Sequence, residues 1–249
     1  TAGLSEVTLA ATAGDGGWSL TGRKVAVESA GGATFLLVTA RTDAGLAQFL
    51  VPADAAGVTI TPMETVDLTR RFGSVAFDSV HVDASAVVGT SETTEADVQR
   101  QLQVANALQC AETVGALDTA FQMTVDWAFD RYSFGRPLAS YQALKHRFAD
   151  MKSWLEASHG LADLAVSAVQ AGRRNADEMA SAAKAYIGQY GPELCQECVQ
   201  LHGGIGVTFE HDLHLYLRRV TLNAVLFGTV TDHRLRLTDI LEAREASAA

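Results

Sequence analysis

The sequence predicts an α+β protein in which a small β-sandwich or β-barrel domain precedes an antiparallel four-helix bundle. Short segments rich in β-branched and aromatic residues recur through the first ~90 residues, separated by Gly, Asp and Pro. Ala, Leu, Gln and Glu dominate the rest, where apolar residues recur at helical spacing. The change follows a polar segment around Ser91, so we expect one domain over residues 1–92 and a second over residues 93–249.

The strands of the first domain are predicted from short alternating or β-rich segments that lie between turn residues. These segments occupy residues 17–22, 33–41, 46–52 and 74–82. Short strands that recur at intervals of about 8 to 20 residues are typical of a small sandwich or barrel.

Five helices are predicted for the second domain. The first begins near Thr94, because Thr94-x-x-Asp97 resembles a helix start. Its apolar face consists of residues three or four positions apart, namely Cys110, Val114, Leu117, Phe121, Val125 and Ala128. Pro137 and the preceding Gly135-Arg136 are expected to end this helix, since proline has no N–H group and restricts the residue before it. The other helices are expected over residues 140–171, 176–202, 213–227 and 232–244.

The composition is that of a globular protein, with 48% hydrophobic and 19% charged residues in a chain of 249. A net charge of −10 argues against nucleic acid or an anionic membrane as a partner, because phosphate groups attract a basic surface. The sequence contains no run of 18 apolar residues, so no membrane span is predicted. Three cysteines without a disulfide pattern favour a reducing, cytoplasmic location.

Two short motifs raise the question of a metal site. Cys195-x-x-Cys198 lies within a helical pattern and lacks a second ligand pair, so we interpret it as two buried thiols rather than a zinc or redox site. His211 and His214 have no acidic third ligand at a convincing spacing, and we interpret them as surface residues. No metal site is therefore predicted.

The segment RYSFG (residues 131–135) is a candidate phosphate-binding segment at the end of the first helix. Arg131 offers a forked pair of donors and Ser133 adds a hydroxyl group, a combination that suits a pyrophosphate. The structural alternative is a capped helix end, where a cation interacts favourably with the helix dipole and Phe134 lies in the core. Gln142, which opens the next helix, could bond a ribose or a base edge, although surface glutamines commonly have no such role.

The segment QLHGGIG (residues 200–206) begins 65 positions after Gly135. Glycines allow a ligand to approach the backbone closely. No strand precedes this segment and its spacing is not that of a Rossmann turn, so the alternative is a helix C-cap. His202 borders the loop, where it either satisfies an internal hydrogen bond or bonds a ligand held by the loop.

Together these motifs resemble the C-terminal domain of the acyl-CoA dehydrogenase family of flavoenzymes. The resemblance extends over RYSFGRPLASYQALKHRFADM (residues 131–151) and QLHGGIGVTFEHDLHLYLRR (residues 200–219). Residues 67–89 and 17–32 are similar to the middle β-domain of that family. The family also has an N-terminal helical domain, which has no counterpart in this sequence. Because the chain begins at Thr1 rather than at Met, we expect an N-terminal portion to be absent.

The resemblance implies FAD as the cofactor and an acyl-CoA thioester as the substrate. The family desaturates such thioesters: a carboxylate takes the α-proton while FAD accepts a hydride from the β-carbon. The resemblance assigns contacts with the ADP part of FAD to Arg131, Ser133, Phe134, Gln142, Gln200 and Gly204, with His202 and Gly203 in the same loop. In that family these contacts are made largely to the flavin of the neighbouring subunit.

The two positions at which the family carries its catalytic base hold no acid in this chain. The base is usually the Glu of a Tyr-Glu-Gly-Thr motif, and the matching position here is Phe227, followed by Gly228 and Thr229. Other members place the base 26 residues before the motif arginine, which corresponds to Ala105. Neither side chain can accept a proton, so no catalytic residue is predicted.

The positions that contact the flavin ring also differ. Where the family commonly has Trp-x-Thr, this chain has residues 26–28 (Ala-Val-Glu), and Glu28 places a negative charge where a reduced, anionic flavin would form. We expect the other nearby carboxylates to be solvated, namely Glu112, Glu210 and Asp212. Asp232 and His233 are adjacent on a helix, where successive side chains point about 100° apart, so we do not expect them to act as a pair.

The retained residues would act on a partner's FAD, and the lost ones would build this chain's own ring site and base. We therefore expect a non-catalytic subunit of a heteromeric acyl-CoA dehydrogenase, in an α2β2 heterotetramer with a base-bearing subunit. By family habit the acceptor is electron-transfer flavoprotein, and such heteromers are associated with steroid side-chain CoA thioesters. Two alternatives are a self-sufficient flavin dehydrogenase or oxidase with an unidentified base, and a non-enzymatic scaffold.

Overall fold

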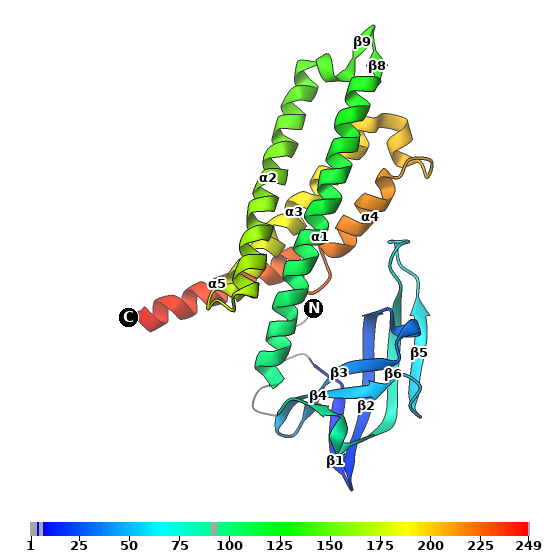
Figure 1. The fold of residues 1–249 in the computed structure, drawn as a ribbon, viewed down its shortest axis with the longest axis vertical. Coiled ribbons are helices and arrows are strands. Elements are labelled where there is room, and N and C mark those ends of the chain that lie inside the picture. Colours follow the sequence, from blue (N-terminus) through cyan, green and yellow to red (C-terminus); the bar gives the residue numbers. More distant parts are fainter. Residues whose placement is uncertain (1–3, 5–6, 91–93, 249) are drawn as a thin grey trace. The chain divides into compact units, whose positions relative to one another are not determined.

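The computed structural model describes residue 4, residues 7–90 and residues 94–248. The chain divides into two compact units, of which one extends to Gln101 and the other begins at Leu102 (Figure 1). The α+β organisation predicted from the sequence is confirmed. The boundary predicted between residues 92 and 93 lies outside the described residues. The first turns of the long helix α1 belong to the β unit, where Gln101 and the buried Gln48 exchange two side-chain hydrogen bonds of 2.9 and 3.0 Å.

In the described part of the first unit, seven strands form one mixed sheet (Figure 1). They are β1 (Ala10–Gly14), β2 (Gly17–Glu28), β3 (Phe35–Thr42), β4 (Gly45–Pro52), β5 (Val58–Met63), β6 (Phe72–Asp83) and β7 (Val87–Val88). Their order across the sheet is β5-β6-β2-β1-β3-β4-β7. All neighbours are antiparallel except β1 and β3, which pair in parallel.

The sheet curls around one apolar core, as the predicted sandwich or barrel requires. The ring of Trp18 on β2 meets the ring of Phe49 on β4 edge to face, with 5.5 Å between the ring centroids. These strands are three places apart in the sheet, a separation of about 14 Å if the sheet were flat. Strong curvature therefore brings both ends of the sheet to one core, in which Leu20, Val51 and Val80 are fully buried.

Three strands of this sheet were not predicted from the sequence, namely β1, β5 and the two-residue strand β7. The segment AATAG of β1 consists of small residues that carry almost no hydrophobic alternation. In β5, Pro62 interrupts a short β-rich segment, and β5 accordingly lies at one edge of the sheet. For β1 and β5, pairing with the long strand β2 or β6 supplies what the local sequence lacks.

The second unit is a helical bundle. Its described helices are α1 (Thr94–Asp130), α2 (Gln142–Gln170), α3 (Ala176–His202), α4 (Leu213–Asn223) and α5 (Val230–Ala248). Two short elements interrupt them at one end: the hairpin of β8 (Tyr132–Ser133) with β9 (Arg136–Pro137), and the 3-10 segment η5 (Gly203–Val207). The main core is shared by α1, α2, α3 and α4, through buried residues such as Leu117, Leu155, Leu194 and Val220. The four-helix bundle predicted from the sequence is thus confirmed.

Two helix ends differ from the prediction. The first helix ends at Asp130, before Gly135 and Pro137, because residues 132–137 form a hairpin instead of a last helical turn. The fourth helix ends at Asn223 rather than near residue 227, because residues 224–229 form a turn in which Phe227 and Gly228 adopt positive φ. Both differences arise from left-handed backbone conformations, which a hydrophobic pattern does not reveal.

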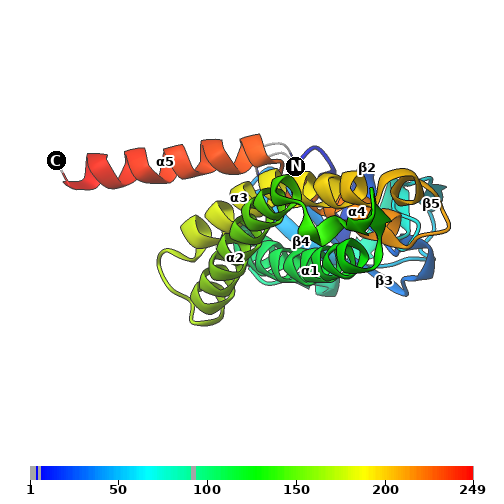
Figure 2. The same ribbon diagram turned by 90° about the horizontal axis from the view of Figure 1, so that it is seen from above.

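The last helix, α5, leaves the bundle along its C-terminal half. Figure 2 shows α5 extending away from the other helices, and its residues 241–247 are exposed. Its N-terminal half is fastened to α3, since Arg236 bonds both carboxylate oxygens of Asp177 at 2.8 and 2.9 Å. Within the described residues, none of these helices combines the length and the apolar character that crossing a membrane requires.

Candidate cofactor-binding site

The β8–β9 hairpin presents Phe134 to solvent. Phe134 and Gly135 form its two-residue turn with φ of 49° and 80°, a combination that usually selects Asn-Gly rather than phenylalanine. The Phe134 side chain is 97% exposed. The hairpin is held against the start of α2, because the Tyr141 hydroxyl donates to the Ser133 carbonyl at 2.7 Å and the Arg136 guanidinium lies 3.9 Å from the Tyr141 ring centroid. An aromatic ring is therefore held away from the core, which excludes the core role considered for Phe134.

Arg131 follows the last residue of α1 and points its cation toward an aromatic ring. Its guanidinium carbon lies 5.8 Å from the centroid of the Trp127 ring. Within the described residues no carboxylate pairs with it, and its side chain is exposed. The hydrogen bond from the Leu138 N–H to the Arg131 carbonyl, at 2.8 Å, ties its backbone to the returning chain. The cation is available to an anionic ligand.

The glycine segment forms an open bend at the end of α3. Gly203 has φ of 66° and ψ of −140°, a conformation that residues with a Cβ atom essentially do not adopt. A Cβ atom placed on Gly203 or Gly204 would meet nothing within 4 Å, so the backbone there faces open space. By contrast, a Cβ atom on Gly206 would lie 2.6 Å from the Val199 carbonyl oxygen. Gly206 thus closes the bend against α3, and Gly203 and Gly204 remain accessible.

His202 is buried beneath this bend, with 4% of its surface exposed. The carbonyl of Cys198 can only accept, so Nδ1 of His202 carries a proton and donates to it at 2.8 Å. Burial lowers the pKa of His202, which keeps the ring neutral at neutral pH. Its Nε2 atom is buried and, within the described chain, has no hydrogen-bond partner.

The two motifs meet through Trp127, a residue that neither motif contains. The Trp127 ring stacks on the His202 ring with 5.3 Å between the centroids and 19° between the planes. Trp127 precedes Arg131 by one helical turn, so it connects the hairpin end of α1 to the glycine end of α3. The i, i+4 spacing of an aromatic residue and an arginine was the available signal in the sequence.

The remaining predicted residues lie at the same end of the bundle (Figure 1). Gln142 is the first residue of α2 and Gln200 lies in the last turn of α3, and both are exposed. An ion pair between Arg147 of α2 and Glu197 of α3 fixes these two helix ends relative to each other. The structure thus gathers both motifs and Gln142 at one end of the bundle, with Phe134, Arg131 and the Gly203–Gly204 backbone facing solvent.

The turn between α4 and α5 holds Phe227, which is 37% exposed and has φ of 58°. The Asp232 carboxylate accepts from the Thr229 N–H at 2.8 Å, which caps α5. The buried ring of His233 bonds the Phe227 carbonyl through Nε2 at 3.2 Å, and burial lowers the pKa of His233 to about 4. Asp232 and His233 therefore bond different groups. As predicted from the sequence, they do not form an acid–base pair.

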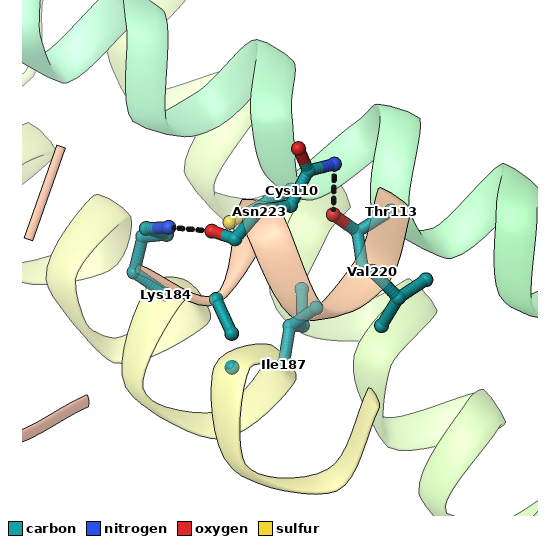
Figure 3. A pocket seen from close by; sticks show the side chains of 8 residues that line it. Cys110, Thr113, Lys184, Ile187, Val220 and Asn223 are labelled. Carbon is teal, nitrogen blue, oxygen red and sulfur yellow. Dashed lines mark hydrogen bonds between the residues drawn. The ribbon is translucent and has the colours of Figure 1, made fainter. Parts of the chain in front are cut away.

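A buried polar cluster lies at the end of α4, where this turn begins (Figure 3). Lys184 of α3 donates to the Gln109 amide oxygen of α1 at 2.6 Å and to the Asn223 carbonyl at the end of α4. Burial lowers the pKa of Lys184 to about 8. Asn223 donates through its side chain to the Thr113 hydroxyl at 3.0 Å and to Glu112 at 2.9 Å. The cluster joins three helices where the turn leaves α4.

The structure corrects the prediction made for Glu112. It was predicted to be a solvated surface carboxylate, and it instead forms an ion pair with Arg219 as well as the bond from Asn223. The prediction failed because the partners come from α4, more than 100 residues along the chain. Glu210 and Asp212 are exposed, as predicted. His211 and His214 are half-buried rather than surface residues, with their rings against His202 and Phe209 at 4.6 and 4.8 Å.

In the β unit, the segment that contains Glu28 is irregular. The register between β2 and β6 shifts between Lys24 and Val27, and Ala26 has φ of 52°. A bulge of this kind re-aims the side chains beside it. The Glu28 carboxylate lies 3.4 Å from the Arg70 guanidinium, so its charge is partly compensated within the chain.

The cysteines are structural. Cys195 and Cys198 are fully buried free thiols, as predicted, and burial raises the pKa of Cys198 to about 12. A thiol of this kind stays protonated and is a poor nucleophile and metal ligand. In the described ranges, no group of three His, Cys, Asp or Glu side chains is arranged to hold a metal ion.

Comparison with known domain families accounts for both units. Residues 96–241 match the acyl-CoA dehydrogenase C-terminal domain, and residues 2–80 match the acyl-CoA dehydrogenase middle domain. The chain belongs to the acyl-CoA dehydrogenase family. This membership confirms the resemblance found in the sequence, and neither matching domain is the family's N-terminal one.

Relatives in this family include acyl-CoA dehydrogenase IpdE2 of Mycolicibacterium smegmatis, which is 31% identical over 200 residues, 77% of this chain and 58% of IpdE2. The ChsE4–ChsE5 complex of Mycobacterium tuberculosis contains a chain with a TM-score of 0.87 and 28% identity, over 94% of this chain and 62% of that one. A variant of the Tcur3481–Tcur3483 steroid acyl-CoA dehydrogenase has a TM-score of 0.83 and 29% identity, over 97% and 63%. This chain thus spans about three fifths of these relatives.

Proposed function

We propose that this chain is the base-lacking subunit of a heteromeric, FAD-dependent acyl-CoA dehydrogenase, and that it completes the FAD site of a base-bearing partner subunit. The observation that carries the proposal is an asymmetry within the bundle. The end that would bind a dinucleotide has an exposed arginine, an open glycine backbone and exposed amides, whereas the turn that would hold a base carries Phe227.

The residues at the hairpin end fit the ADP half of FAD. The Arg131 guanidinium and the Ser133 hydroxyl suit phosphate oxygens, which accept forked, charge-assisted hydrogen bonds. The Gly203–Gly204 backbone has room for a ligand that no side chain fills. Gln142 and Gln200 offer amide groups to a ribose or base edge, and the exposed Phe134 ring offers an apolar face. When bound, FAD would supply the hydride acceptor for desaturation of the acyl group.

The side chains at the two candidate positions, and the carboxylates nearest to them in sequence, support the lack of a catalytic base. Phe227 and Ala105 carry only carbon beyond the backbone and cannot accept a proton. The carboxylates nearest in sequence are already committed, since Glu112 pairs with Arg219 and Asp232 caps α5. In this proposal the partner's carboxylate takes the α-proton of the thioester.

The β unit also favours a flavin ring that is held by the partner subunit. The ring of a reduced flavin is anionic, and a carboxylate beside it disfavours that state. Glu28 occupies the bulged segment that corresponds to the family's ring contacts, and the Arg70 partner stabilises the carboxylate there. We infer that this chain does not build a ring site of its own and that the partner holds the ring.

The proposed assembly is an α2β2 heterotetramer with two FAD sites, each between unlike subunits. The ChsE4–ChsE5 complex and the Tcur3481–Tcur3483 pair support a mixed assembly, and the latter, a steroid acyl-CoA dehydrogenase, supports a bulky substrate such as a steroid side-chain CoA thioester. Electron-transfer flavoprotein is the acceptor we propose, and the cytoplasm is the proposed location.

Flavin stoichiometry tests the proposal. The chain would be purified alone and after co-expression with a base-bearing acyl-CoA dehydrogenase subunit, and FAD would be measured by its visible absorbance. We expect no flavin on the chain alone and about one FAD for each mixed pair. One FAD on each copy of the chain alone would overturn the proposal in favour of a self-sufficient flavoenzyme.

The Arg131→Ala variant of the mixed assembly distinguishes the proposed FAD-binding role of this chain from a scaffold role. Loss of a charge-assisted hydrogen bond costs about 1.5–3 kcal/mol, so we expect FAD affinity to fall at least tenfold. The matched control is Arg174→Ala, an exposed arginine in the connection between α2 and α3 at the other end of the bundle. Equal FAD affinity in both variants would support a scaffold that does not touch the flavin.

A further inference from the structure

Trp127 connects the two motifs of the candidate site without belonging to either. The Arg131 guanidinium carbon lies 5.8 Å from the Trp127 ring centroid, and the ring of His202 stacks on the same indole with 5.3 Å between the centroids. His202 in turn meets the ring of His211, with 4.6 Å between the centroids. A continuous row of side chains therefore runs from the end of α1, through the end of α3, to the loop before α4.

We propose that Trp127 is a positioning residue that orients the Arg131 guanidinium for a phosphate group, with His202 as its support. The proposal rests on the function proposed above, because that function gives Arg131 its ligand. A guanidinium that lies over an aromatic ring keeps its N–H groups, which point outward in its plane, free for hydrogen bonds. The ring also restricts the arginine to fewer rotamers, which lowers the entropy lost when a ligand binds.

The polar atoms of the row distinguish this role from simple core filling. Nε1 of Trp127 and Nε2 of His202 are both buried, and within the described residues neither has a hydrogen-bond partner. Burying an unpaired N–H or ring nitrogen costs free energy that phenylalanine and leucine would avoid. The indole is the aromatic side chain that attracts a cation most strongly, which gives a reason for its presence beside Arg131.

His202 supports the ring without repelling the cation. The hydrogen bond from Nδ1 to the Cys198 carbonyl fixes the orientation of the imidazole, and burial keeps it neutral. A protonated His202 would place a second positive charge behind Trp127. Because the His202 ring is neutral, the Arg131 guanidinium carries the positive charge beside Trp127.

Three variants separate positioning from packing. Trp127→Leu removes the aromatic face, and Trp127→Phe retains an aromatic face while losing the indole N–H. Trp154→Leu is the matched control, because Trp154 on α2 stacks on Tyr190 with 5.6 Å between the centroids and, among the described residues, no arginine lies over its ring. A loss of stability from removing a stacked indole should appear in both leucine variants.

The first measurement needs no ligand and no partner. The Arg131 Nε–H resonance of the ¹⁵N-labelled full chain is identified by its loss in Arg131→Lys. We expect its ring-current shift to persist in Trp127→Phe and Trp154→Leu and to disappear in Trp127→Leu. An unchanged resonance in Trp127→Leu would overturn the proposed contact, whatever the outcome of the flavin experiment.

The second measurement is the affinity of the full chain for ADP, by titration of the same resonances. We expect Trp127→Leu to weaken ADP binding about two- to fivefold, the range of an exposed cation–π contact, and Trp127→Phe to recover most of that loss. Equal weakening in Trp154→Leu, or no weakening in Trp127→Leu, would overturn the positioning role. If ADP does not bind the unchanged chain alone, the same three variants are compared for FAD affinity in the mixed assembly, where the same order is expected. Equal FAD affinities of Trp127→Leu and the unchanged chain would then overturn the positioning role, and the first measurement still decides the contact.

Discussion

Single residues at the hairpin end of the bundle hold conformations that cost stability. Phe134 sits in a left-handed turn with its ring 97% exposed, although Asn would fit that backbone better. Non-glycine residues in this region cost on the order of 1 kcal/mol and are enriched at functional sites. Under the proposed function, Phe134 provides an apolar surface for the cofactor or for the partner subunit.

The bend at residues 203–206 contains three glycines, of which Gly203 and Gly204 are exposed and Gly206 is buried. Substituting them gives a test at the scale of single residues. Gly206→Ala places a Cβ atom 2.6 Å from the Val199 carbonyl oxygen and 2.9 Å from the His202 Cβ atom, so we expect a loss of about 1–3 kcal/mol of stability. Gly204→Ala meets nothing within 4 Å, so we expect little change in stability. Chemical denaturation of the chain alone measures both.

The same two variants also report on the ligand. In the mixed assembly, Gly204→Ala should lower FAD affinity because the new methyl group occupies the space left open at the bend. If Gly204→Ala binds FAD as the unchanged chain does, the open backbone is a helix C-cap and not a cofactor surface.

At the scale of elements, the turn between α4 and α5 depends on buried groups that come from other helices. His233 bonds the Phe227 carbonyl and lies 3.3 Å from the Ser181 hydroxyl of α3. Lys184 bonds the last carbonyl of α4, and Gly228 has no room for a side chain because the His233 ring lies 2.7 Å from its Cβ position. The backbone of the turn is therefore held in place although Phe227 has no acid–base role.

His233 gives the bundle a predicted pH dependence. Its pKa falls from 6.5 to about 4 on folding, so the unfolded chain binds the proton more readily between these values. The stability that the neutral ring contributes is complete above pH 6.5 and is lost as the pH falls toward 4, a total on the order of 3 kcal/mol. Urea unfolding of the chain across this range measures the slope.

The control for that slope is His233→Asn, which has an amide and no titrating group at this position. We expect the stability of this variant to change less than that of the unchanged chain between pH 6.5 and 4. Equal slopes would mean that other groups, such as the carboxylates, cause the acid sensitivity.

At the scale of the whole molecule, the chain consists of two units with separate cores. The β unit is organised around Phe49 and its neighbours, and the bundle around Leu117, Leu194 and Cys198. Domains with their own cores are able to unfold separately. The chain spans about three fifths of its relatives, so the activity of a complete assembly belongs to the proposal above.

Leu117→Ala tests the independence of the two units. Leu117 is fully buried in the bundle core, and removing such a side chain costs about 2–5 kcal/mol. We expect the thermal transition of the helices, followed by far-ultraviolet circular dichroism, to move to lower temperature. The β unit, followed by amide resonances of β2 and β4, should melt as before. A parallel shift of both transitions would mean that the units unfold as one.

The sequence by itself determined the fold class, the family and the candidate cofactor residues, because these depend on local signals. Hydrophobic spacing predicted the long helices, and the motifs around Arg131 and Gly203 carried the resemblance that the domain matches confirm. It also predicted the buried state of Cys195 and Cys198.

Only the tertiary structure decided what depends on contacts between distant segments. It placed Glu112 in an ion pair with Arg219 and Lys184 among buried amides. It ended α1 and α4 early through left-handed turns, and it joined the two motifs through Trp127 and His202. The physical reason is that charge pairing, burial and ring stacking are properties of residues that meet in space, and spacing along one helix does not specify which residues of another helix will meet it.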